Sequence, residues 1–254
     1  MTSAAERWRG QLAAWTIPDK ILAQAPESPW GFPPELFGAP PDPAGSPSRD
    51  RALEALPDGG SVLDVGCGGG VGAMGLVPPA ALVVGADESA AMLEKFAAAA
   101  AERGVEHHVV HGRWPDIAGH AGTADVVVCH HVLYNVADLE PFVRALTSAA
   151  SRRVVVELTA THPMTISAPL WRHFWNLERP GGPTAELALE AIRDLGVDAR
   201  IEHWSRPARI VDRSVYVRMN RQRLCLPVDA EPEVDSVMAP TDTPRDVVTI
   251  WWDV

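Results

Sequence analysis

A glycine-rich turn is the first group of residues suited to chemistry. Gly66, Gly68 and Gly70 follow the apolar run 62–65, and alanine-rich helical sequence comes directly after them. Glycines let backbone N–H groups approach a ligand closely, and a helix N-terminus offers partial positive charge. The next apolar run ends on Asp87, where a carboxylate can accept hydrogen bonds from the hydroxyls of a ribose. Together these residues predict a binding site for a nucleoside cofactor.

Polar side chains after the apolar run 125–129 are suited to the reaction itself. His130, His131 and Tyr134 stand there, and ligands of open α/β sheets bind beyond the carboxyl ends of the strands. A histidine in such a place can remove a proton from an oxygen or nitrogen nucleophile near neutral pH. We therefore predict His130, His131 and Tyr134 as catalytic residues. For each histidine alone, packing or orienting the cofactor is the alternative.

Alternating strands and helices must position these two groups. Apolar β-formers recur along the chain with helical segments between them, and this alternation predicts a parallel, doubly wound sheet. The predicted strands are 62–65, 81–86, 106–110, 125–129, 153–158, 199–204 and 247–252. The predicted helices are 4–15, 48–56 with Ser48 as cap, 90–103, 138–150, 170–177, 184–195 and 212–238 with a break near Pro227.

The chain divides into three parts around the predicted cofactor-binding core. Residues 1–47 hold a short helix and then a proline-rich segment from Pro18 to Pro47, which excludes regular helix and central strand there. The aromatic residues of this segment favour an ordered cap over a solvated linker. Residues 48–160 form the core, and residues 161–254 complete the sheet and add helical insertions on the substrate side. We expect one structural domain overall.

The composition indicates an ordinary globular protein. Of its 254 residues, 46% are hydrophobic and 22% are charged. The sequence shows no apolar signal segment and no run of about 18 apolar residues, so no membrane span is expected. Its three cysteines have no ligand spacing, which favours a reduced, cytoplasmic protein. We expect a monomer or homodimer. The net charge of −11 disfavours nucleic acid as a partner.

The core resembles the class I S-adenosylmethionine-dependent methyltransferases. Three stretches carry the resemblance: 62–70 (Val-Leu-Asp-Val-Gly-Cys-Gly-Gly-Gly), 85–93 (Gly-Ala-Asp-Glu-Ser-Ala-Ala-Met-Leu) and 125–138 (Asp-Val-Val-Val-Cys-His-His-Val-Leu-Tyr-Asn-Val-Ala-Asp). It covers residues 48–160 well and the flanks poorly. It implies a seven-stranded mixed sheet of order 3-2-1-4-5-7-6 with an antiparallel last strand. It also implies S-adenosylmethionine as cofactor and S-adenosylhomocysteine as product.

The resemblance assigns cofactor-binding residues one by one. The glycines would pass the backbone around the methionine part of the cofactor, Asp64 would organise that turn, and Asp87 would bind the ribose hydroxyls. The family often has Asp after the equivalent of Gly112, but this chain has Arg113. Trp114 then either covers the adenine or is a core residue. The full set is Asp64, Gly66, Cys67, Gly68, Gly70, Asp87, Glu88, Met92, Arg113, Trp114 and His130.

A nicotinamide-binding Rossmann enzyme is the main rival for the cofactor. Residues 70–75 fit the pattern G-x-G-x-x-G, but the match begins five residues beyond the strand. The dinucleotide pattern starts at the strand end. Asp64, two residues before the first glycine, also suits the methyltransferase pattern better.

The implied function is in-line transfer of a methyl group to an oxygen, nitrogen or carbon of a small molecule. Nine tryptophans and the acidic charge favour a small, partly apolar acceptor. We predict that the acceptor contacts Trp30, Phe32, Tyr134, Glu157, Trp171 and Trp175, and we expect no metal. The alternatives are an RNA or protein methyltransferase that uses the basic stretch 206–223, and a non-catalytic protein that binds S-adenosylmethionine.

Overall fold

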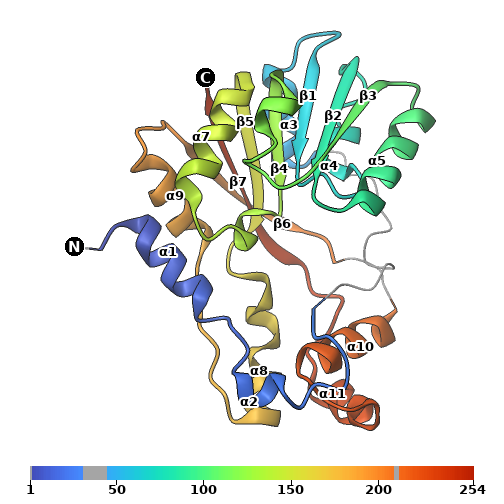
Figure 1. Ribbon diagram of the computed structural model, residues 1–254, viewed down its shortest axis with the longest axis vertical. Helices are drawn as coiled ribbons and strands as arrows, with labels where there is room; N and C mark the ends of the chain where they lie inside the picture. Colours follow the sequence, from blue (N-terminus) through green and yellow to red (C-terminus); the bar gives the residue numbers. More distant parts are fainter. Residues whose placement is uncertain (1, 31–44, 209–211) are drawn as a thin grey trace.

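The fold is built around one seven-stranded mixed sheet (Figure 1). The computed structural model describes residues 2–30, 45–208 and 212–254. The strands are β1 (Ser61–Val65), β2 (Leu82–Asp87), β3 (Glu106–His111), β4 (Ala124–His130), β5 (Ala150–Thr159), β6 (Arg200–Arg206) and β7 (Arg245–Asp253). They lie in the order β3-β2-β1-β4-β5-β7-β6, and β7 runs antiparallel to β5 and β6. The predicted strand order and the antiparallel last strand are therefore confirmed.

Alternating side chains send the apolar residues of the central strands into two cores. Along β4, Val127 and Cys129 enter one core, while Val126 and Val128 enter the other, as the two-residue repeat of a strand requires. Helices of the first core are α1 (Ala4–Ala13), α7 (Leu139–Ala149) and α9 (Ala185–Arg193). Helices of the second core are α3 (Pro47–Ala55), α4 (Val71–Met74) and α5 (Ala90–Glu102). Helices on both faces make the sheet doubly wound.

A third apolar core lies beyond the carboxyl ends of the parallel strands. Figure 1 shows a group of helices there, below the sheet in that view. We call them the helical cap: α2 (Asp19–Leu22), α8 (Ala168–Trp175), α10 (Arg213–Arg223) and α11 (Glu231–Val237). Trp171 and Leu224 are 2% and 1% exposed in its core. Short 3₁₀ helices lie in the connections at Leu133–Asn135, Pro163–Ser167 and Val228–Ala230.

Local differences separate the structure from the sequence expectation. The helix expected to begin after Ser48 has Ser46 as its N-cap, whose Oγ accepts from the Arg49 N–H at 3.3 Å. Ser48 is instead buried, with its hydroxyl 2.6 Å from that of Thr249 in β7. Two four-residue helices, α2 and α6 (Ala118–Ala121), lie where no helix was expected. Both are too short to show a helical repeat in the sequence. The exclusion of helix from the segment Pro18 to Pro47 was therefore wrong for α2, because no proline interrupts the chain between Pro18 and Pro26.

The proline-rich segment is described only in part. Residues 31–44, which include Phe32, lie outside the described residues. Before them, α2 buries Ile21 in the core of the helical cap. Within the described ranges, no helix has both the length and the apolar character needed to cross a membrane.

Candidate functional site

The glycine turn leads from β1 into α4 and lies against the end of β4. Gly66, Gly68 and Gly70 have left-handed backbone angles, with φ of 69°, 49° and 87°. The Gly66 N–H donates to the Ala86 carbonyl of β2 at 2.8 Å, which fixes the start of the turn beside that strand. A Cβ on Gly66 would lie 2.4 Å from Val132 Cγ2. Only glycine fits there, so the turn is a tightly closed backbone loop.

Asp87 joins the end of β2 to the glycine turn. Its Oδ2 accepts from the Gly68 N–H at 2.9 Å, and its Oδ1 accepts from the Ser89 N–H at 2.8 Å. Each carboxylate oxygen has a second lone pair, so Asp87 can accept two further hydrogen bonds from a ligand. The structure thus brings Asp87 and the turn together, while the binding of a ribose stays a prediction.

The buried Asp64 and the half-buried His130 lie together beside the turn. The Asp64 Oδ2 accepts from the Ala73 N–H of α4 at 3.0 Å. Burial raises the pKa of Asp64 to about 6, against the lowering effects of His130 and of the Ala73 N–H. A Cβ on Gly72 would lie 3.1 Å from His130 Nδ1 and 3.2 Å from Asp64 Oδ2. Gly72 therefore leaves room for both groups, a role that the sequence pattern does not reveal.

The other predicted cofactor residues differ in burial. Trp114 is 8% exposed in the first core, and its Nε1 has no hydrogen-bond partner among the described residues. This leaves both of its predicted roles open. Met92 on α5 is half-buried, and Glu88 and Arg113 are exposed. Cys67 is buried in the second core, and burial raises the pKa of its thiol, so the thiol is neutral at neutral pH.

Three side chains from different strands meet at the carboxyl edge of the sheet. His131 follows β4, Glu157 lies near the end of β5, and Arg206 ends β6, which is parallel to β5 because β7 is antiparallel to both. His131 Nε2 lies 3.0 Å from Glu157 Oε1. Arg206 Nη1 lies 3.2 Å from that oxygen and 3.1 Å from that ring nitrogen. We call this group the His131–Glu157–Arg206 triangle.

Glu157 is charged although it is buried. Its side chain is 2% exposed, against 17% for Arg206 and 39% for His131. Burial by itself raises the pKa of Glu157, but the charge of His130 and the hydrogen bond and charge of His131 outweigh it and hold the pKa at about 2. Glu157 is thus an ionised acceptor at neutral pH. The sequence analysis placed Arg206 only in the basic stretch, because no spacing in the sequence signals that β6 ends beside β5.

Tyr134 lies in the first core. Its ring stacks on Trp8 of α1, with ring centroids 5.4 Å apart, and its hydroxyl donates to the Thr159 carbonyl at 2.7 Å. It is 7% exposed, and burial raises the pKa of the hydroxyl. These contacts make Tyr134 a link between α1 and the end of β5. Its catalytic and acceptor-binding roles stay predictions.

The aromatic residues predicted to bind the acceptor lie in different environments. Trp171 is 2% exposed within the helical cap. Trp175 packs against the same core, and its Nε1 donates to the Leu224 carbonyl at 2.8 Å. Trp30 is 62% exposed, and Phe32 lies outside the described residues. Trp171 and Trp175 therefore hold the cap together, whichever surface the acceptor touches.

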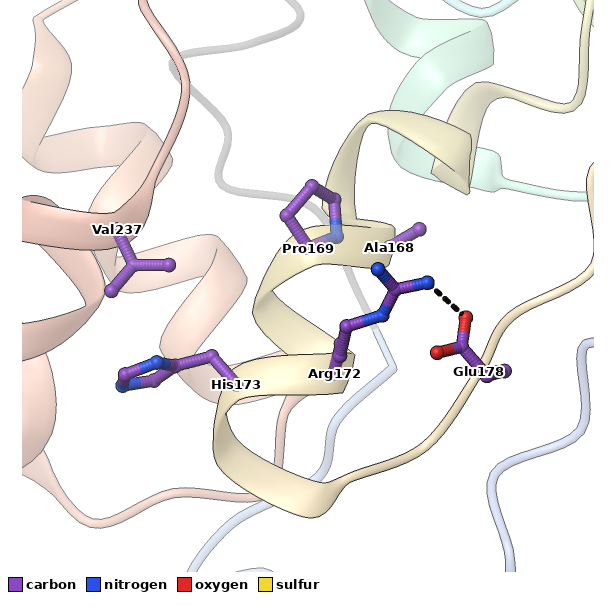
Figure 2. A pocket seen from close by; sticks show the side chains of 6 residues that line it. All are labelled: Ala168, Pro169, Arg172, His173, Glu178 and Val237. Carbon is purple, nitrogen blue, oxygen red and sulfur yellow. Dashed lines mark hydrogen bonds and ion pairs between the residues drawn. The ribbon is translucent and has the colours of Figure 1, made fainter.

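A surface hollow of about 400 Å³ opens between α8 and α11 (Figure 2). Its lining residues are Ala168, Pro169, Arg172, His173, Glu178 and Val237. Arg172 Nη2 is 2.5 Å from Glu178 Oε2, and these side chains are 67% and 73% exposed. His173 Nε2 lies 2.8 Å from Glu233 Oε1 of α11. Because its charged groups are exposed and already paired within the chain, we assign no ligand to this hollow.

Arginines of the basic stretch 206–223 are engaged in internal contacts. Arg213 Nε lies 2.5 Å from Asp235 Oδ1. Arg221 is 3% exposed and forms an ion pair with Glu27. These pairings take up positive charge that binding to RNA would require.

Comparison with known proteins identifies the same part of the chain. Residues 62–152 match the family model of a methyltransferase domain. The chain is 39% identical over 88 residues to the ubiquinone biosynthesis O-methyltransferase of Escherichia fergusonii, and equally to that of Escherichia coli. The matched residues are 34% of this chain and 37% of each relative. The match thus spans little more than a third of the length of these curated relatives.

Solved structures share the fold over most of the chain. A putative methyltransferase of Bacillus halodurans has a TM-score of 0.55 at 14% identity, covering 82% of this chain and 99% of that one. Coclaurine N-methyltransferase, bound to N-methylheliamine and S-adenosylhomocysteine, has a TM-score of 0.53 at 16% identity, covering 99% and 86%. At these identities the likeness shows the fold alone.

Proposed function

We propose that this chain, which contains a class I S-adenosylmethionine-dependent methyltransferase domain, transfers the methyl group of S-adenosylmethionine to a small-molecule acceptor. The glycine turn carries the proposal, because its backbone closes between β2 and β4 with the Asp87 carboxylate bonded to it. A small acceptor is supported by the relatives named as ubiquinone biosynthesis O-methyltransferases. The net charge of −11 disfavours a polyanionic one.

The residues at the turn fit S-adenosylmethionine by their chemistry. Asp87 keeps lone pairs for two ribose hydroxyls. His130 Nε2 is buried without a hydrogen-bond partner in the described part of the chain, beside Asp64. We assign the ribose to Asp87 and the amino-acid portion of the cofactor to Asp64 and His130. When bound, the cofactor supplies a methyl group on a cationic sulfur, which reacts with a nucleophile without further activation.

The chain's own residues then have to orient the reactants, exclude water and accept a proton. The turn and Asp87 hold one reactant in a fixed place, which lowers the entropic cost of the encounter. The helical cap lies beyond the carboxyl edge of the sheet, on the side from which water must be excluded (Figure 1). His131 stands at this edge within the triangle and is the candidate proton acceptor.

A cytoplasmic location is part of the proposal. Cys67, Cys129 and Cys225 are all free and buried. Unpaired cysteines are usual in reducing compartments. Cells that express the protein can be lysed in denaturant with a thiol-alkylating reagent. Alkylation of all three cysteines would show that their thiols are reduced in the cell.

Binding followed by turnover tests the function. The chain is titrated with S-adenosylhomocysteine in a calorimeter and then given methyl-labelled S-adenosylmethionine with phenol, amine and thiol acceptors. We expect one cofactor per chain and label on an acceptor. Binding of a nicotinamide dinucleotide in place of S-adenosylhomocysteine would overturn the assignment of S-adenosylmethionine as the cofactor. Cofactor binding without transfer to any acceptor would favour the non-catalytic alternative.

A further inference from the structure

The His131–Glu157–Arg206 triangle poses a question of proton placement. Its three polar atoms lie 3.0, 3.2 and 3.1 Å apart, all within hydrogen-bond range of one another. An arginine N–H always donates, and an ionised carboxylate always accepts. The His131 Nε2 is the one atom of the three that can do either. Its protonation state therefore decides which of the contacts are hydrogen bonds.

Only one arrangement lets both His131 and Arg206 donate to the Oε1 of the buried Glu157 carboxylate. If Nε2 carried no proton, its lone pair would face Glu157 Oε1 at 3.0 Å, and the two would repel. If Nε2 carries the proton, both His131 and Arg206 donate to this oxygen, and both hydrogen bonds are charge-assisted. A bond to a buried charged acceptor favours that tautomer roughly tenfold or more. The free lone pair of the neutral ring is then on Nδ1.

The backbone holds the ring in this position. The His131 N–H donates to the Glu157 carbonyl at 2.6 Å, so the two residues are joined by main chain as well as side chain. His131 has φ of 59°, a left-handed angle that is uncommon outside glycine and gathers at functional sites. The ring is therefore fixed over the carboxylate, with Nε2 turned inward.

The other ring nitrogen is available to a ligand. The His131 side chain is 39% exposed, whereas Glu157 is 2% exposed. Within the described part of the chain, Nδ1 makes no hydrogen bond. The next residue, Val132, packs directly on Gly66 of the cofactor turn. A proton acceptor thus stands one residue from the turn.

We propose that Glu157, itself held by Arg206, is a positioning residue that keeps the proton of His131 on Nε2, so that Nδ1 receives a proton from the methyl acceptor. The inference rests on the proposed methyl transfer and narrows its substrate class. The methylated atom is an oxygen or nitrogen that carries a proton in the bound acceptor, as in a hydroxyl or ammonium group. Acceptors with no such proton have no use for this arrangement.

The proton and electrons balance as follows. The O–H or N–H proton of the acceptor passes to the Nδ1 lone pair of His131. The electron pair freed on oxygen or nitrogen forms the bond to the methyl carbon, and the pair of the broken carbon–sulfur bond stays on sulfur. The His131 imidazolium, stabilised by Glu157, returns its proton to solvent after the methylated product leaves.

Nuclear magnetic resonance of the ligand-free chain tests the tautomer. Long-range ¹H–¹⁵N spectra of histidine-labelled protein separate the two neutral tautomers, and His131→Gln assigns the signal. We expect the Nε2–H form to dominate by roughly tenfold or more in the wild type and in Arg206→Met. Glu157→Gln should bring the two forms toward equal populations. A wild-type ring protonated on Nδ1 would mean that Arg206 donates to Nε2, and it would overturn the proposal.

A second histidine–glutamate pair provides the matched control. His173 Nε2 lies 2.8 Å from Glu233 Oε1 on the exposed face of the helical cap, with exposures of 42% and 59%. Glu233→Gln should leave the His131 tautomer unchanged. If Glu233→Gln changed the tautomer populations of His131 as much as Glu157→Gln does, the change would be a general effect of charge. That result would contradict a direct effect of Glu157 on His131.

Labelled methyl transfer tests the acceptor class. The acceptors are a phenol, a secondary amine and a thioether built on one apolar frame. We expect label on the phenol or secondary amine, and a fall in turnover of at least about 100-fold in His131→Gln. Label on the thioether, with His131→Gln as active as wild type, would overturn the assignment. Absence of label on every acceptor would count against methyl transfer itself. The magnetic resonance spectra determine the His131 tautomer independently, because they need neither cofactor nor acceptor.

Discussion

The two ends of the site are built from different parts of the chain. At the cofactor end, backbone N–H groups of the glycine turn meet a carboxylate only 19 residues away in sequence, in the contact between Gly68 and Asp87. At the reacting end, side chains from three strands meet, and His131 and Arg206 are 75 residues apart. The first end depends on backbone geometry. The second depends on the charge of a buried carboxylate, so different substitutions should disable each.

Gly66→Ala should have the largest effect, and it acts on the backbone end. Alanine is strained at a left-handed φ, and its Cβ would lie 2.4 Å from Val132 Cγ2. We expect the free energy of unfolding to fall by about 2–5 kcal/mol, with loss of S-adenosylhomocysteine binding. Gly59→Ala is the control, with φ of 73° but nothing within 4 Å of the added Cβ. Denaturation measures stability and calorimetry measures S-adenosylhomocysteine binding. If Gly59→Ala lost as much of both as Gly66→Ala, a specific role for Gly66 would be contradicted.

Asp64→Asn should change how stability depends on pH. The pKa of Asp64 is raised from its usual 3.8 to about 6, mainly by burial. The contribution of the protonated Asp64 to the free energy of unfolding is fully present below pH 3.8 and is lost as the pH rises through about 6. The loss amounts to about 3 kcal/mol. Relative to wild type, Asp64→Asn should therefore gain up to about 3 kcal/mol between about pH 4 and pH 7. A difference that stays constant in urea titrations over this range would refute the raised pKa.

Glu157→Gln should show the opposite sign at the reacting end. The net effect of its surroundings lowers the pKa of Glu157 from 4.5 to about 2, because His130 and His131 outweigh burial. The contribution of ionised Glu157 to the free energy of unfolding is fully present above pH 4.5 and is lost as the pH falls through about 2. The loss amounts to up to about 3 kcal/mol. The wild type should lose stability on acidification below about pH 4.5 more steeply than Glu157→Gln. Parallel acid titrations of the two chains would contradict this.

Asp87→Ala should weaken cofactor binding while leaving the triangle intact. Loss of hydrogen bonds to a charged group costs about 1–3 kcal/mol of binding free energy. Asp87→Asn keeps an acceptor oxygen, so its loss should be smaller. Calorimetry with S-adenosylhomocysteine measures both. Unchanged affinity in Asp87→Ala would remove Asp87 from the ribose site.

Tyr134→Phe should have the smallest effect. It removes the hydrogen bond to the Thr159 carbonyl and keeps the ring on Trp8, so stability should fall by about 1 kcal/mol. Turnover should stay at the wild-type level. A large fall in turnover at unchanged stability would instead support the predicted catalytic role of Tyr134.

The same contrast explains what could be predicted from the sequence. The strand order was implied by the resemblance, which rests on three short stretches of sequence, and the structure confirms it. Asp87 was predicted beside the turn because it ends the next strand along the chain. The role of Arg206 could not be predicted from the sequence. Arg206 lies beside Glu157 only because β6 pairs with β7, and this pairing joins segments that are far apart in the chain. Ser46 rather than Ser48 caps α3 because Ser48 is drawn into the core by Thr249, a contact 201 residues away.

Calorimetry with S-adenosylhomocysteine, run on wild type, Gly66→Ala and His131→Gln, tests the division between the two ends most directly. His131→Gln changes a side chain that we assign to the acceptor, and Gly66→Ala changes the backbone that we assign to the cofactor. We expect His131→Gln to bind like wild type and Gly66→Ala not to bind. Binding lost in both variants, or kept in both, would contradict the account.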